Sequence, residues 1–158
     1  MQELATWFDE SSFGTYFLRL SLAVLLGGLL GYNRERADKP AGLRTHMMVA
    51  LGAALFTVLS FEASEASGGD DSALRLDPFR SVQGIIGGLG FLGAGSIIRD
   101  DGGGIGSKAT VSGLTTAASI WLTGALGVAA GMGAYAVASV TAVMALLVLG
   151  MSRFVDRQ

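Results

Sequence analysis

The stretch at residues 109–151, ATVSGLTTAASIWLTGALGVAAGMGAYAVASVTAVMALLVLGM, contains no charged side chain. A helix needs about 20 predominantly apolar residues to cross a hydrocarbon core of roughly 30 Å, so this stretch is long enough to cross a bilayer twice. The composition of the whole chain agrees, because 51% of its 158 residues are hydrophobic and 15% are charged, with a mean hydropathy of +0.53. We therefore expect an integral membrane protein and not a soluble domain.

Three further apolar segments precede this stretch. Together they predict five spans, at about 16–32, 43–61, 79–98, 109–130 and 134–151. We expect helices, because every backbone N–H and C=O must be paired internally in lipid and the segments lack the alternation of a barrel strand. The sequence predicts an all-α integral membrane protein, with residues 1–158 forming one bundle of about five transmembrane helices.

The cations are concentrated in every second connector and in the tail. Eight of the eleven Lys and Arg residues fall there, namely Arg34, Arg36, Lys39, Arg44, Arg99, Lys108, Arg153 and Arg157. Loops rich in Lys and Arg stay in the cytoplasm. This distribution predicts a cytoplasmic C-terminus and an N-terminus outside.

Several classes of function are not expected. The chain has no cysteine and one histidine, so it offers no cluster typical of a zinc or iron–sulfur site. A net charge of −2 provides no basic surface for nucleic acid. We also find no plausible hydrolytic triad and no Asp or Glu in the middle of a span. We expect no enzyme activity, no metal site and no cofactor.

Glycines carry the strongest local pattern. Gly88, Gly90 and Gly93 have the G-x-G-x-x-G spacing of a dinucleotide-binding turn, but that turn follows a strand and needs an acidic residue about 20 positions later. Here that position reads SGLT. We interpret the glycines as surfaces that let helix backbones approach, the neighbour being a helix of this chain, a second copy or a partner. The predicted packing residues are Gly27, Gly31, Gly84, Gly88, Gly90, Gly93, Gly95, Gly113, Trp121, Gly127 and Gly131.

Polar residues mark the ends of three spans. Asp77 suits an N-cap before Pro78, and Arg80 with Gln83 shares one helix face that points either into the bundle or to solvent. The single histidine, His46, is expected to be a structural group or a proton relay.

A hydroxyl stripe follows one face of the fourth span, formed by Ser112, Thr116, Ser119 and Thr123. Such hydroxyls bond back to their own helix, bond across a helix contact, or line a path. All three alternatives stay open from the sequence.

Three segments together resemble the membrane domain of the MgtC/SapB family of bacterial inner-membrane proteins. They are GYNRERADKPAGLRTHMMVALGAALFTVLS at 31–60, DPFRSVQGIIGGLGFLGAGSIIR at 77–99 and GLTTAASIWLTGALGVAAGMGAY at 113–135. The resemblance implies a five-helix domain in the inner membrane, a link to growth in low magnesium and to virulence, and in some members restraint of the F-type ATP synthase.

Two departures limit what the resemblance implies. Many members carry Glu where this chain has Asn33, which puts the role of that carboxylate in doubt. Members of the MgtC type also carry a soluble C-terminal domain, whereas the printed sequence ends at Gln158, so regulation through that domain is not carried over.

The leading hypothesis is a regulator of ion homeostasis that binds a membrane partner such as the F-type ATP synthase, with Arg44, Thr45, His46, Arg80 and Gln83 forming the polar contacts of the bundle. Two alternatives are a cation (Mg²⁺) or proton transporter, with a path along Thr115, Thr116, Ser119 and Gln83, and a homo-oligomeric structural protein. The candidate functional residues are Arg34, Glu35, Arg44, Thr45, His46, Asp77, Arg80, Gln83, Arg99, Thr115, Thr116 and Ser119. Self-association is expected because the glycine faces exceed what five short helices need.

Overall fold

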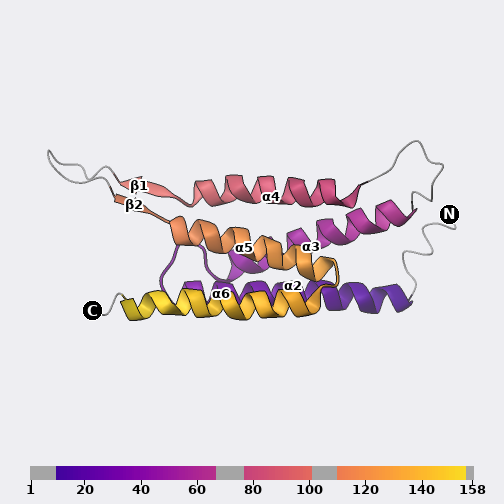
Figure 1. Cartoon of the computed structure of the whole chain (residues 1–158), viewed down its shortest axis with the longest axis horizontal. Coiled ribbons are helices and arrows are strands. Elements are labelled where there is room, and N and C mark those ends of the chain that lie inside the picture. The colour runs from indigo at the N-terminus through magenta and orange to yellow at the C-terminus, as the bar shows by residue number, and fades with distance from the viewer. Residues whose placement is uncertain (1–9, 67–76, 101–109, 156–158) are drawn as a thin grey trace.

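The computed structural model describes residues 10–66, 77–100 and 110–155. The elements in these ranges are, in order, α2 (Glu10–Glu35), α3 (Leu43–Ala66), α4 (Pro78–Gly95), β1 (Ile98–Asp100), β2 (Thr110–Ser112), α5 (Leu114–Gly131) and α6 (Tyr135–Val155). Successive helices run in opposite directions along the long axis of the molecule (Figure 1). The connector between α2 and α3, the two strands and the last turn of α6 therefore share one end, which we call the cation-rich end. The side of the membrane that this end faces stays a prediction.

Hydropathy confirms an all-α membrane protein. Within the described ranges, three segments are long and apolar enough to cross a membrane: Phe13–Glu35, Leu43–Glu65 and Leu114–Gly131. A shorter apolar segment, Tyr135–Met151, belongs to α6. The third expected span, now α4, is not among the three, because Arg80, Gln83 and its many glycines make it less apolar.

The predicted junction between the third and fourth spans is wrong. The sequence predicted helix up to residue 98 and again from 109, but α4 ends at Gly95 and α5 begins at Leu114. Between them, β1 and β2 pair antiparallel, with Ile98 opposite Ser112. Gly113 then turns the chain into α5 with φ +91°, a left-handed conformation that glycine adopts without strain.

The core is the mutual contact of α2, α3 and α5, with α6 packed against α2 and α5. Small residues bring the backbones together. A Cβ added to Gly27 would lie 2.7 Å from the carbonyl oxygen of His46, and one added to Gly131 would lie 2.7 Å from that of Ala54. Gly31 and Gly127 are equally close to α3. In lipid, where apolar burial gives little driving force, such close backbone packing stabilises helix association.

Several other predicted packing residues do not fill this role inside the chain. Four glycines have no atom within 4 Å of where a Cβ would lie, and Gly93 meets Ala117 only at ordinary van der Waals distance. The four are Gly84, Gly88, Gly90 and Gly95. Within this chain no neighbour packs against these four positions, and α4 lies at one edge of the bundle (Figure 1), so the prediction that a second copy or a partner packs there stays a prediction. Gly113 serves the backbone turn described above.

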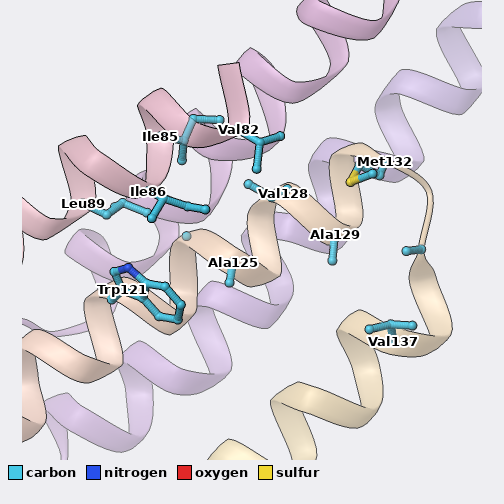
Figure 2. A pocket seen from close by; sticks show the side chains of 12 residues that line it. Val82, Ile85, Ile86, Leu89, Trp121, Ala125, Val128, Ala129, Met132 and Val137 are labelled. Atoms are coloured by element: carbon cyan, nitrogen blue, oxygen red, sulfur yellow. The ribbon is translucent and has the colours of Figure 1, made fainter. Parts of the chain in front are cut away.

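Helix α4 is attached mainly to α5. Leu89 lies against Gly124, where a Cβ on the glycine would collide with the leucine side chain. Beside this contact runs an apolar groove, in which Trp121 of α5 lies opposite Ile86 and Leu89 of α4 (Figure 2). Trp121 is half exposed, so it lines a groove and is not a buried packing residue.

Candidate functional site

Four polar side chains are buried where α2, α3 and α5 meet: Arg34, His46, Thr116 and Ser119. We call this set the polar junction. It lies toward the cation-rich end, because Arg34 belongs to the last turn of α2, His46 to the first turn of α3 and Thr116 to the first turn of α5. The junction therefore ties the adjoining ends of the consecutive helices α2 and α3 to the start of α5, with contacts that span 82 and 73 positions of the sequence.

Arg34 is the buried charge of the junction. Its side chain is only 4% exposed, and Nη2 donates a 2.8 Å hydrogen bond to Oγ1 of Thr116. The Nε atom is buried without an acceptor. The carbonyl ends of α2 favour a cation at this position, but a guanidinium with one neutral partner still bears a large desolvation cost. A residue kept at such a cost is a candidate for function.

His46 is completely buried and joins α3 to α5. Its Nδ1 lies 2.9 Å from the carbonyl oxygen of Gly42, and its Nε2 lies 3.1 Å from Oγ of Ser119. Ser119 Oγ is also 2.8 Å from the carbonyl oxygen of Thr116. The polar chain thus runs from the backbone before α3 through the imidazole to the first turns of α5.

Glu35 closes the first turn of α3. Its Oε2 accepts a 2.7 Å hydrogen bond from the backbone N–H of Leu43, the first residue of that helix. A carboxylate at a helix N-terminus satisfies a free donor and complements the helix dipole. Glu35 therefore holds the start of α3, and with it the backbone that His46 contacts.

Arg19 marks the opposite end of the bundle. Its Nη1 donates a 3.2 Å hydrogen bond to the carbonyl oxygen of Gly131, the last residue of α5. A cation beside the last carbonyls of a helix is favourable. Arg19 thus stabilises the end of α5, a contact that the sequence alone does not reveal because the two residues are 112 positions apart.

The structure brings only some of the predicted site residues together. The junction contains Arg34, His46, Thr116 and Ser119, and Glu35 lies beside it. The others are exposed: Arg44, Thr45, Asp77, Arg80, Gln83 and Thr115. Arg99 belongs to β1, and its side chain lies outside the described residues.

The prediction that five named residues form the polar contacts of the bundle is therefore right for only one of them. His46 takes part in them, but Arg44, Thr45, Arg80 and Gln83 do not. Successive helical residues differ by about 100° in direction, so only one of three neighbours on α3 faces the core. Asp77 has the capping role that the sequence predicts, since its Oδ1 accepts from the N–H of Phe79 at 2.9 Å.

The hydroxyl stripe is buried from Thr116 through Ser119 to Thr123. Thr123 Oγ1 donates to the carbonyl oxygen of Ser119 at 2.8 Å, so the stripe bonds to its own helix as well as across the junction. Ser112 belongs to β2 and is exposed, so it is not part of the buried stripe.

Comparison with known proteins decides the family. The model of the MgtC family matches residues 20–158. The chain belongs to the MgtC family. Relatives of this MgtC-family chain include "Protein SrpB" of Synechococcus elongatus, 43% identical over 83% of this chain and 71% of the relative. "Putative magnesium transporter YhiD" of Escherichia coli is 38% identical over 85% of this chain and 59% of its own length.

"Protein MgtC" of Brucella abortus is 40% identical over 85% of this chain and half of its own length. The MgtC-family chain thus spans between half and about 70% of the length of these relatives. No solved structure matches it. The family match and the three long apolar helices of the described ranges together support a membrane protein.

Proposed function

We propose that this protein is a non-enzymatic regulator of ion homeostasis in the bacterial inner membrane, which binds another membrane protein through α4. The observation that carries the proposal is the outer face of α4. Gly84, Gly88 and Gly95 lie there without any chain atom against them, and the Phe91 side chain between them is 86% exposed. These glycines cover about three helical turns beside a projecting ring, and they offer a surface that a second helix can approach closely in lipid.

The polar junction supports regulation over conduction. A guanidinium fixed between α2 and α5 repels a divalent cation, and in the described spans Asp and Glu occur only near the helix ends. Mg²⁺ sheds its water reluctantly and is usually bound by carboxylates. In the described part of the chain, no three His, Cys, Asp or Glu side chains lie together as a metal-binding group.

The resemblance to the MgtC/SapB family makes the F-type ATP synthase the first candidate partner. A second copy of the chain would use the same α4 surface, which is the homo-oligomeric alternative. We also propose the orientation that the cations indicate, with the cation-rich end in the cytoplasm.

Transport is the second candidate, favoured by one specific observation. A relative 38% identical is named "Putative magnesium transporter YhiD". A path would have to follow the hydroxyls of Thr116 and Ser119, both of which are already hydrogen-bonded inside the junction.

Photo-crosslinking from α4 tests the proposal. The chain has no cysteine, so Gly88→Cys introduces a single thiol that a photoactivatable maleimide can label in native membranes. Leu147→Cys is the matched control, because Leu147 is 65% exposed on α6. We expect an adduct with a defined membrane protein from position 88 and none from 147, and an ATP synthase subunit in that adduct identifies the partner.

Other outcomes are equally informative. An adduct between two copies of the chain assigns the α4 face to self-association. If position 88 gives no specific adduct at all, the proposal is overturned.

A further inference from the structure

We propose that His46 is a reversible proton-binding site, in which a proton bound at Nε2 is donated to the hydroxyl of Ser119, whose own hydrogen is directed to the backbone carbonyl of Thr116 in α5. This goes beyond the proposed function and does not depend on it, because His46 and Ser119 lie in the contact of α2, α3 and α5 and not on the α4 surface. The ligand is a proton from water at the cation-rich end. Its uptake forms one N–H bond at Nε2 and breaks none in the protein.

The first step is the tautomer of the imidazole. Nδ1 of His46 lies 2.9 Å from the carbonyl oxygen of Gly42. A carbonyl oxygen only accepts hydrogen bonds, so Nδ1 carries a hydrogen and donates it. In the neutral ring, Nε2 is then a lone-pair acceptor.

The second step is a count of hydrogens at Ser119. Its Oγ is 3.1 Å from His46 Nε2 and 2.8 Å from the carbonyl oxygen of Thr116. The hydroxyl has one hydrogen, and with a neutral imidazole both neighbours are acceptors. Only when Nε2 is protonated are both contacts satisfied, because Nε2–H then donates to Oγ and the hydroxyl donates to Thr116. The site therefore has a place for one additional proton at Nε2, and this proton forms a hydrogen bond from Nε2 to Oγ of Ser119.

The third step is the charge that opposes this proton. From α2, the charged group facing His46 is Arg34, which is bonded to Thr116 one helical turn from Ser119. From α5, no charged residue is present between Leu114 and Gly131, and Glu35 is engaged with the N–H of Leu43 at the exposed edge. Hydrogen bonding thus favours protonation, while burial of the imidazole and, after it, the charge of Arg34 oppose it. Neutralising Arg34 removes one of these two opposing effects.

The packing turns this proton into a structural signal. The imidazole is fully buried, and the backbone carbonyl of His46 lies directly against Gly27 of α2. Protonation adds a second positive charge beside that of Arg34. The added charge lies next to the close backbone contact between α2 and α3. Acidification at the cation-rich end is therefore expected to loosen α2 from α3.

The single histidine makes the test direct. The full chain, labelled with ¹⁵N-histidine and placed in lipid nanodiscs, gives the signals of one imidazole while the pH is lowered from about 8 to about 4. We expect the Nδ1–H tautomer at high pH and reversible conversion to the doubly protonated ring. In Arg34→Gln the conversion is expected at a higher pH than in wild type, whereas Arg34→Lys keeps it close to wild type. Ser119→Ala, which removes the acceptor, is expected to move it lower.

Two results overturn the proposal. One is an Nε2–H tautomer at neutral pH, and the other is a ring that stays unprotonated down to about pH 4 in both the wild type and Arg34→Gln. The tautomer is measured on the wild type alone, so the proposal stays falsifiable even if a variant does not fold. Neither result affects the cross-link from α4, so the two proposals fail separately.

Discussion

Gly27→Ala should weaken the contact between α2 and α3. The added Cβ would lie 2.7 Å from the carbonyl oxygen of His46 and 2.8 Å from the Cβ of Ala50. Ordinary van der Waals contact begins at 3.4 Å, so the two backbones must separate by about 0.6–0.7 Å. Neither neighbour is the end of a flexible side chain, and the helices have to move as units.

The cost follows from this displacement. Adding a methyl group to a well-packed contact costs about 1–3 kcal/mol. Alanine regains about 0.5–1 kcal/mol of helix propensity over glycine. We expect a net loss of about 1 kcal/mol, within a range of about 0–2.5 kcal/mol, in the free energy of unfolding.

Unfolding in mixed micelles, followed by tryptophan fluorescence, measures this loss. Gly52→Ala is the matched control, because it lies on α3 with nothing within 4 Å of its Cβ position and should gain stability. If Gly27→Ala proves as stable as Gly52→Ala, the close contact between α2 and α3 does not exist as described.

Three further substitutions test the polar junction and its surroundings by the same unfolding assay. Arg34→Met removes a buried cation with one neutral partner, so we expect unchanged or increased stability, by up to about 4 kcal/mol; a clear loss would show that the guanidinium is better compensated than its contacts indicate. Gly113→Ala forces a side chain into φ +91° and against the carbonyl oxygen of Ser96, at a cost of at least about 1–2 kcal/mol, and wild-type stability would be incompatible with that turn. Glu35→Ala removes the acceptor of the Leu43 N–H, and should cost about 1 kcal/mol and speed amide exchange at that residue; unaltered exchange would argue against the cap.

Much of the fold could be predicted from the sequence, because hydropathy and charge are local properties. The uncharged stretch at 109–151 contains α5 and most of α6, and the connector between α2 and α3 lies at the same end as the two strands (Figure 1). The strand pair is not predictable in the same way, because each strand is only three residues long and lies at the edge of an apolar segment that predicts a helix. Ile98 and Ser112 pair with each other, and their pairing depends on where α4 ends.

The site was less predictable, because it depends on which helix faces meet. Arg34 and Thr116 are 82 positions apart, and no periodicity in either segment indicates their contact. The same G-x-x-x-G spacing occurs at Gly27 and at Gly84, yet the first is in tight contact and the second is open. Small residues show where a helix can approach, but not whether one does.

Mg²⁺ uptake by proteoliposomes that contain only this protein, read with an internal fluorescent indicator, decides most directly between regulation and transport. We expect uptake no faster than in protein-free liposomes, because a fixed guanidinium stands between α2 and α5 and the buried hydroxyls already have partners. Saturable uptake that disappears in Thr116→Val would instead establish a transport path through the polar junction.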